Sequence, residues 1–196
     1  MISLLPPIGN KKMNHKILNK LENMIHISPK LLRNPETLRQ AIRGAFAVDV
    51  EDVSYNNIGE LVDKIDNLVL DHYFRHVWQG HIAKFKYSGP ALIGEINKLK
   101  PRKVLDIGCG YHEFKGKIDN LVGIDPYNDA ADICVKLLDY HPAEKYDAIM
   151  ALGSINFGST DKIFAELSHA VDLCNPGAVM FFRANPGLAH DPDESN

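Results

Sequence analysis

Residues 104–110 read Val-Leu-Asp-Ile-Gly-Cys-Gly, and this stretch decides the fold of the chain. An apolar run that ends in glycine predicts a buried strand of a parallel sheet, which delivers the chain to a tight turn. Gly108 and Gly110 have no side chains to block a ligand, so we expect backbone N–H groups of the turn to meet a carboxylate, ribose or phosphate. Asp106 can accept a hydrogen bond from an ammonium group or, through water, from a hydroxyl. The stretch therefore predicts a nucleotide-cofactor site.

Short apolar runs, each ended by Gly, Asp or Pro, recur through the second half of the chain. They predict buried strands at residues 103–107, 121–124, 132–135, 148–152 and 178–182. A helix over residues 161–173, capped by Thr160, precedes the last strand. We expect its inward face to consist of Ile163, Phe164, Leu167, Ala170 and Val171. The alternation predicts an α/β fold, a Rossmann-like and mostly parallel sheet of order 3-2-1-4-5 flanked by helices.

The first part of the chain has the pattern of helices. Apolar residues recur at helical spacing in residues 17–25, and Asn34 followed by Pro35 predicts the start of a second helix. Asn57 and Glu60 have the spacing of a capping box variant at the start of a third. The apolar stripe that follows comprises Leu61, Val62, Ile65, Leu68, Val69 and Tyr73.

A fourth helix begins near Ser88 and Pro90, and it adjoins the first strand of the sheet. Its expected buried residues are Leu92, Ile93, Ile96 and Leu99. We therefore divide the chain into an N-terminal helical extension or lid (1–87), a Rossmann-like domain (88–188) and a polar tail (189–196).

Composition and charge exclude several classes of protein. The chain has 196 residues, 45% of them hydrophobic, and a formal net charge of −3, which indicates no general affinity for nucleic acid. An odd count of cysteines, three in all, argues against a disulfide framework. No apolar stretch approaches the roughly 20 residues of a membrane span. We expect a cytoplasmic protein without a membrane segment.

Two further turns stand where the predicted strands end or begin. Asp125, at the end of the second strand, is placed to hold both hydroxyls of a ribose. Tyr127 follows it and could stack on a base. The pair Pro176-Gly177 predicts a turn that returns the chain from the helix to the last strand. Two carboxylates, Asp106 and Asp125, would then bracket a ligand of the size of adenosine.

Together these motifs resemble those of the class I S-adenosylmethionine-dependent methyltransferases. Residues 104–110 are similar to the first motif of that family, residues 122–126 (Val-Gly-Ile-Asp-Pro) to its second, and residues 173–178 (Leu-Cys-Asn-Pro-Gly-Ala) to the turn before its fifth strand. Residues 146–150 (Tyr-Asp-Ala-Ile-Met) resemble the start of its fourth strand. The resemblance covers about half of the chain, residues 90–187, and implies S-adenosylmethionine as the cofactor.

The resemblance also implies roles for individual residues. The turn formed by Asp106, Gly108, Cys109 and Gly110 would contact the methionine end of the cofactor. Asp125 would hold the ribose, and the residues expected near the adenine are Pro126, Tyr127, Leu137 and Leu138. Gly153 and Ser154, just past the fourth strand, would lie near the sulfonium and the substrate. The catalytic candidates are His112 and Asn156, and no metal is expected.

The sequence departs from the family pattern in several places. Residues 111–120 leave room for a first helix of no more than about two turns, and the second crossover has no room for a helix. Lys136 stands where the family often has Asp. The last two strands of the family are missing, so we expect either a truncated sequence or a sheet edge that pairs with a partner, for instance in an oligomer.

Several residue clusters have an ordinary structural interpretation that we favour. His72, His76 and His81 lack the Glu of a His-Glu-x-x-His zinc motif, so metal binding is not expected. The helical spacing of Tyr73, Phe74, Trp78 and Phe85 favours packing over a substrate pocket. Cys109 is expected to be a packed thiol rather than a nucleophile.

The favoured hypothesis is a methyltransferase that acts on a small molecule, with residues 58–88 as a wall or lid of the acceptor site. The Asn/Asp-Pro-Pro-Tyr/Phe and Pro-Cys motifs of enzymes that methylate nucleic-acid bases are absent, so we do not expect nucleic acid as the acceptor or partner. One alternative is a non-catalytic module that binds S-adenosylmethionine or a partner. Another is a nicotinamide-dependent oxidoreductase, although Glu113 stands where that family has its third glycine.

Overall fold

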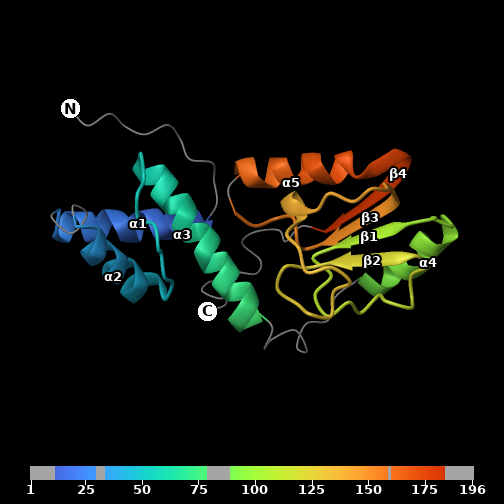
Figure 1. The fold of residues 1–196 in the computed structure, drawn as a ribbon, viewed down its shortest axis with the longest axis horizontal. Coiled ribbons are helices and arrows are strands. Elements are labelled where there is room, and N and C mark those ends of the chain that lie inside the picture. The colour runs from blue at the N-terminus through green and yellow to red at the C-terminus, as the bar shows by residue number, and fades with distance from the viewer. Residues whose placement is uncertain (1–11, 30–33, 79–88, 159, 184–196) are drawn as a thin grey trace. The chain divides into compact units, whose positions relative to one another are not determined.

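The computed structural model describes residues 12–29, 34–78, 89–158 and 160–183 (Figure 1). The chain divides into two compact units, one of Met1–Ile82 with Gly158–Lys162 and the other of Ala83–Phe157 with Ile163–Asn196. His81, Phe85, Ser88 and the expected polar tail lie outside the described residues. No helix in the described ranges is long and apolar enough to cross a membrane.

In the described part of residues 1–82, the first unit contains α1 (Lys12–Ile27), α2 (Pro35–Phe46) and α3 (Ile58–His72). The last of these continues into a π-helical turn, Tyr73–Val77. The expected caps are confirmed, because the side chain of Asn34 accepts from Glu36 N and Thr37 N and that of Asn57 accepts from Glu60 N. The three helices share one apolar core, which includes Ile17, Leu21, Leu38, Ile42, Leu61, Val62 and Ile65.

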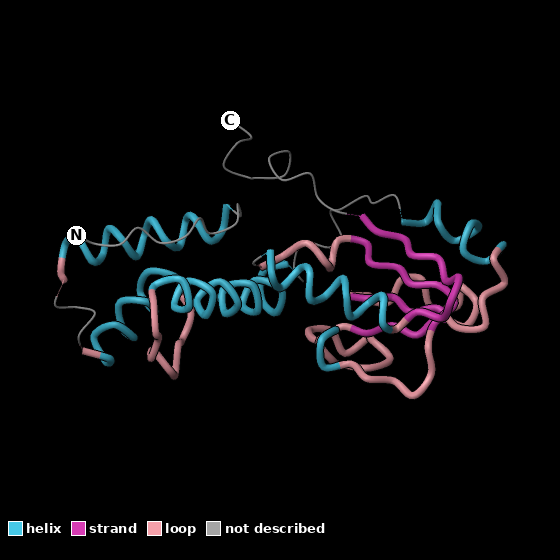
Figure 2. The backbone as a smooth tube through the Cα atoms, turned by 90° about the horizontal axis from the view of Figure 1, so that it is seen from above, coloured by secondary structure: helices cyan, strands magenta, loops and turns pink. Residues whose placement is uncertain are grey.

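The second unit holds a parallel sheet of four strands: β1 (Val104–Ile107), β2 (Leu121–Ile124), β3 (Tyr146–Leu152) and β4 (Cys174–Arg183). Their order is β2-β1-β3-β4, and Figure 2 shows the strands side by side. The sheet confirms the α/β class and the expected mainly parallel arrangement. The expected third strand is wrong as a strand, because residues 132–135 contribute only a parallel bridge between Ile133 and Ile124. The short, polar crossover before it leaves too little chain for a longer ladder.

Helices cover both faces of the sheet (Figure 1). On one face, α5 (Thr160–Asp172) packs Ile163, Leu167 and Ala170 onto a core that includes Leu105 and Ile149. On the other face, a 3-10 turn, Gly89–Ala91, leads into α4 (Leu92–Lys98). The core on that side comprises Ile96, Val104, Phe114, Ile118, Ala148 and Met150. Strand alternation therefore places Asp106 on the same face as Val104, the face covered by α4.

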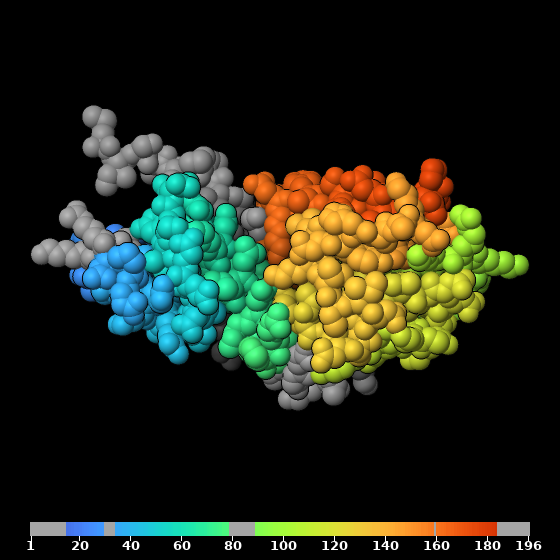
Figure 3. Space-filling view, in the orientation of Figure 1, coloured from blue at the N-terminus to red at the C-terminus, as the bar shows by residue number. Residues whose placement is uncertain are grey.

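The helices bury narrower faces than the sequence pattern predicts. Phe164 and Val171 of α5 are 66% and 58% exposed, and Leu99, just past the end of α4, is 46% exposed. Phe164 and Val171 each follow an inward residue by one position, so the helix turns them away from the sheet. The space-filling view shows the outer surface of α5 (Figure 3).

Two expected connections also differ from the structure. Residues 111–120 form a series of turns, with a bridge between Lys115 and Ile118, and contain no α-helix. Pro176 and Gly177 lie inside β4, not ahead of it, because the strand already begins at Cys174. The positive φ of Gly177, 82°, coincides with a register shift opposite Tyr146 and Ala148, as at a β-bulge.

A pair of substitutions tests this packing. Leu105→Ala empties a fully buried position in the core under α5, so we expect the free energy of unfolding to fall by about 2–5 kcal/mol. Phe164→Ala, the matched control on the exposed surface, should cost about 0.5 kcal/mol or less. Urea denaturation followed by circular dichroism measures both, and a larger loss for Phe164→Ala would contradict the orientation of α5.

Candidate functional site

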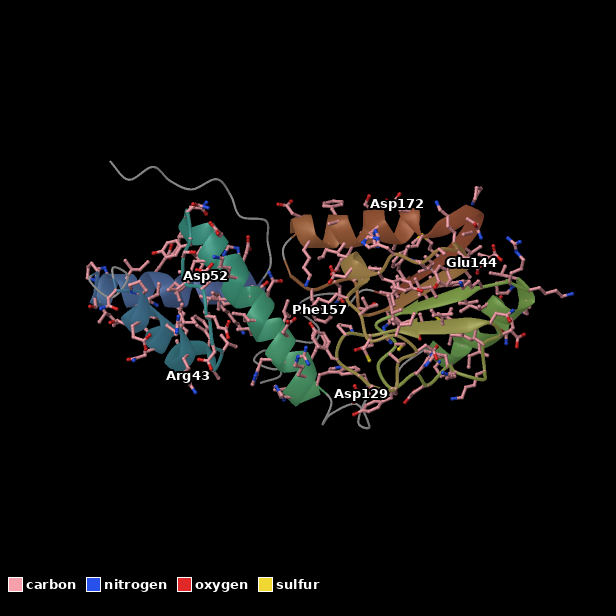
Figure 4. All side chains as sticks on the ribbon, viewed as in Figure 1. Arg43, Asp52, Asp129, Glu144, Phe157 and Asp172 are labelled. Atoms are coloured by element: carbon pink, nitrogen blue, oxygen red, sulfur yellow. The ribbon has the colours of Figure 1, made fainter. Side chains whose placement is uncertain are left out.

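The residues expected to bind the cofactor gather where the parallel strands end. Asp106 lies near the end of β1, Asp125 directly follows β2, and Ser154 lies two residues past β3. In Figure 4 the labelled Phe157, which follows β3, lies at the opposite end of the sheet from the labelled Glu144, which precedes it. Ligands of open parallel sheets bind at the carboxyl ends of the strands, so this edge is the candidate site.

The carboxylate of Asp125 holds the glycine turn against β2. One oxygen accepts from Gly110 N at 3.0 Å, and the other accepts from Tyr127 N at 2.7 Å. Asp125 is only 8% exposed, so these bonds form where water competes little. A carboxylate offers about four lone-pair positions, and two bonds leave it able to accept from the hydroxyls of a ligand.

The backbone N–H groups of the turn are already used, which corrects the expectation that they meet a ligand. Gly108 N and Cys109 N both donate to the carbonyl of Ile124, at 2.8 Å and 3.1 Å, and Gly110 N donates to Asp125. The turn is closed this way because it packs directly onto the end of β2. The glycine turn therefore allows a ligand to approach closely and to meet carboxylate oxygens, but it does not offer unpaired backbone N–H donors.

Gly108 is required by a close approach between β1 and the chain beyond β3. A Cβ atom at this position would lie 2.4 Å from Cβ of Ser154. Gly108 also has a φ of +68°, a backbone angle that residues with a side chain rarely adopt. Ser154 is in turn fixed by its hydroxyl, which donates to the carbonyl of Ile107 at 2.5 Å. The turn and Ser154 are thus locked to one another.

Asp106 is the most unusual group at this edge. It is 3% exposed, and its Oδ2 has no hydrogen-bond partner within the part of the chain that the structure describes. Burial, and then repulsion from Asp125, raises the pKa of Asp106 to about 7. A carboxyl whose charge is so poorly solvated strongly favours a cationic partner.

His112 and Cys109 pack together against β2. A Cβ atom on Gly123 would lie 2.6 Å from His112 Nε2 and 2.8 Å from Cys109 Sγ, so the glycine makes room for both. The His112 ring is buried, and its Nε2 lies 3.6 Å from Oδ2 of Asp132. Burial, followed by repulsion from nearby carboxylates, raises the pKa of the Cys109 thiol well above its ordinary value. Both features favour packing of Cys109.

The remaining predicted residues lie around this centre. Leu137 and Leu138 belong to a 3-10 turn, Leu137–Asp139, in which Leu137 is buried in the core under α5 and Leu138 is 39% exposed. Leu138 is therefore the one with a side chain exposed to solvent. Pro126 and Tyr127 are half-buried beside Asp125, and Asn156 lies two residues past Ser154. Their roles stay predictions.

Two residues at this edge were not predicted from the sequence. Asp132 accepts from Gly123 N at 3.0 Å and pairs with Lys115 and His112. Arg183 ends β4, and its guanidinium lies beside Gly153. Neither residue belongs to a motif that the sequence analysis identified, so only the fold shows what they face. The described residues contain no group of three or more His, Cys, Asp or Glu that could hold a metal ion.

No family model and no curated protein matches the chain. Solved structures that match its fold include the N-methyltransferase NodS from Bradyrhizobium japonicum, 17% identical with a TM-score of 0.41, over 47% of this chain and 60% of that chain. The sugar N-methyltransferase KedS8 from Streptoalloteichus is 16% identical with a TM-score of 0.47, over 57% of this chain and 54% of that chain. An S-adenosylmethionine-dependent methyltransferase from Clostridium acetobutylicum is 17% identical with a TM-score of 0.44, over 61% of this chain and 57% of that chain.

All three of these structures are methyltransferases. The chain spans only a little more than half the length of each of them. At identities of 16% and 17%, this likeness does not by itself indicate a function.

Gly108→Ala tests the contact between the turn and Ser154. We expect it to destabilise the protein by about 1 kcal/mol through the positive φ and by about 1–3 kcal/mol more through the collision. Gly116→Ala is the matched control, because Gly116 has a φ of +74° but nothing within 4 Å of the added Cβ. Thermal unfolding measures both variants. Equal losses would show that the Gly108–Ser154 contact is not close.

The pH dependence of stability tests the burial of Asp106. Its pKa rises from 3.8 to about 7, so the folded chain retains a proton that the unfolded chain releases. The contribution of Asp106 to the free energy of unfolding should therefore fall as pH rises from about 4 to about 7 and stay level above pH 7. Asp106→Asn abolishes the effect, and above pH 7 it should be more stable than the wild type by up to about 4 kcal/mol. Urea denaturation of both proteins across this range measures the difference, and parallel profiles would contradict the raised pKa.

Proposed function

We propose that this chain binds S-adenosylmethionine at the carboxyl edge of its sheet and transfers the methyl group to a small molecule. The observation that supports this most is Asp106, a buried carboxyl without a hydrogen-bond partner on Oδ2 among the described residues, beside a glycine turn. A ligand with a positive charge and adjacent hydroxyl groups matches the two carboxylates of this edge. S-adenosylmethionine has both.

The residues present fit this cofactor. Asp106 would lie near its positive charge, Asp125 would accept from the ribose hydroxyls, and Tyr127 and Leu138 would lie near the adenine. Gly108 and Gly110 allow close approach at the turn, because neither carries a side chain. Gly153 and Ser154 would border the reacting end.

When bound, S-adenosylmethionine supplies a methyl group that is already activated by the sulfonium. The protein then needs to align the acceptor with that methyl group, exclude water and accept a proton where the acceptor carries one. Asn156 lies past β3, the region where an acceptor would dock, and is the preferred candidate for positioning it. His112 is the weaker candidate, because its ring packs against Gly123 and next to Cys109.

The charge of the edge disfavours a nicotinamide dinucleotide. A pyrophosphate is anionic and is usually held by backbone N–H groups at a helix N-terminus. Here the turn donates its N–H groups to Ile124 and Asp125, and no α-helix follows it within residues 111–120. Two buried carboxylates would also repel the phosphates.

Isothermal titration of the full chain tests the proposal. We expect saturable binding of S-adenosylmethionine and S-adenosylhomocysteine and none of NAD. Binding of neither sulfur compound would overturn the proposal. Binding without turnover of any acceptor would instead favour the non-catalytic module.

The affinity should also depend on the ionisation of Asp106. A cation beside this carboxylate favours its charged form, so binding should release a proton below the pKa of about 7. We expect the Kd for S-adenosylmethionine to fall several-fold, up to about tenfold, between about pH 6 and pH 7.5. Asp106→Asn, the control, should bind more weakly and show only the pH dependence of the ligand. If the Kd of the wild type and that of Asp106→Asn changed equally with pH, the positive charge of the ligand would lie away from Asp106.

A further inference from the structure

A charged cavity lies at the amino edge of the sheet, opposite the edge that holds the candidate site. Its volume is about 440 Å³, within the range of about 300–1,000 Å³ that is common for small-molecule sites. The labelled Glu144 marks this edge in Figure 4. The lining residues precede β1 and β3 or lie near the starts of β3 and β4: Arg102, Lys103, Glu144, Lys145, Asp147 and Asn175. A ligand of so polar a cavity has to be charged or strongly polar itself.

The two carboxylates of the cavity are already paired. Asp147 accepts from the backbone N–H of Arg102 at 2.9 Å and from Nδ2 of Asn175 at 2.8 Å. Hydrogen bonds from the side chains of Arg102 and Asn175 lower the pKa of Asp147 to about 2. Glu144 accepts from Nζ of Lys103 at 3.0 Å. Because the lining contains three basic and two acidic side chains, one positive charge is left in excess.

Asp147 holds Arg102 by one edge of its guanidinium and leaves the other edge open. Nε and Nη2 of Arg102 lie 3.3 Å and 3.5 Å from the two oxygens of Asp147. This pairing uses one side of a planar group with five N–H donors, so Nη1 and the second N–H of Nη2 point away from Asp147. The Arg102 side chain is 84% exposed. A ligand therefore meets a fork of donors whose orientation is already fixed.

Lys145 supplies the charge that has no counterion. Its side chain is exposed, and within the described ranges its ammonium forms no ion pair or hydrogen bond. The backbone around it is held in place, because Tyr146 N donates to the carbonyl of Leu173 at 2.9 Å and the Lys145 carbonyl accepts from Asn175 Nδ2 at 3.4 Å. The free ammonium thus projects from a fixed strand end into the same cavity as the open edge of Arg102.

We propose that this cavity binds a phosphate group, either carried by a small molecule or as the free ion. The proposal does not depend on the function proposed for the other edge of the sheet. A phosphate monoester has three terminal oxygens, of which two match the open fork of Arg102 and the third can pair with Lys145. Lys103, although paired with Glu144, adds positive charge beside them. A carboxylate has only two oxygens and could engage one of these groups at a time.

NMR titration of the full chain at constant ionic strength tests the proposal, with inorganic phosphate, glycerol 3-phosphate and acetate as the probes. A pH of about 7.5 keeps the phosphate monoester mainly dianionic. We expect saturable shifts of the backbone amide signals of Arg102, Lys103 and Lys145 with a Kd of about 1 mM or lower, and no shift of Gly110 at the carboxyl edge. Tighter binding of glycerol 3-phosphate than of phosphate identifies an ester as the ligand, and equal binding identifies the free ion.

Lys145→Gln removes a charge without breaking an ion pair, so it should fold as the wild type does and raise the Kd for phosphate about tenfold. Lys117→Gln is the matched control, because Lys117 is an exposed lysine of the same unit that does not line the cavity. Its Kd should stay within about twofold of the wild type. Arg102→Lys keeps the charge but removes the fork, so it should also weaken binding.

Three results would overturn the proposal. The first is the absence of a saturable shift with either phosphate compound, and the second is acetate binding as tight as that of phosphate. The third is an equal Kd for phosphate in Lys145→Gln and Lys117→Gln, which would show that the shifts come from general screening of the surface charge.

Discussion

The hydrogen bond from Gly110 N to the buried carboxylate of Asp125 is the contact on which the candidate site depends. It joins the turn after β1 to the end of β2, two segments that no helix between them holds in place. The carboxylate of Asp125 is only 8% exposed, so this bond places a negative charge in a poorly solvated region. That charge adds to the burial of Asp106 and raises its pKa. One bond thus shapes the turn and sets the electrostatics of the site.

The closed turn also explains which ligands the edge can hold. Loops that bind phosphate do so with successive unpaired N–H groups. In this chain the N–H groups of Gly108 and Cys109 donate to Ile124, and that of Gly110 donates to Asp125. The groups that face a ligand are therefore acceptors. An edge of acceptors favours cations and hydroxyl groups at the β1 and β2 ends.

The features that depend on short-range sequence pattern could be predicted. Residues 121–124 form β2 as expected, and the glycine turn lies at the carboxyl edge with Asp125, because apolar runs and strand-end glycines have a local physical cause. The caps at Asn34 and Asn57 are of the same kind.

The features that depend on which residues pack against one another could not be predicted from the sequence. Phe164 has the spacing of an inward residue but is exposed, since the rotation of α5 is set by the sheet below it. The pairing of the turn N–H groups depends on how closely the turn approaches β2. Arg183 has no local signal at all. These outcomes are decided by packing between segments far apart in the sequence.

The abbreviated crossover after β1 shows how this chain covers its sheet with few residues. A parallel connection usually contains a helix, whose apolar face covers the strands. Here the turns of residues 111–120 place Phe114 and Ile118, 6% and 3% exposed, in the core beside Ile96 of α4. Two buried side chains thus do on this face what a helix would otherwise do. The backbone of this segment is held by turn hydrogen bonds, including those from Lys115 N to His112 O and from Ile118 N to Phe114 O. The side chain of Asn97 in α4 donates to Lys117 O and accepts from Asp119 N. Asp132 pairs with Lys115 of this segment and accepts from Gly123 N of β2, so the short crossover and the wall of the candidate site share one set of contacts.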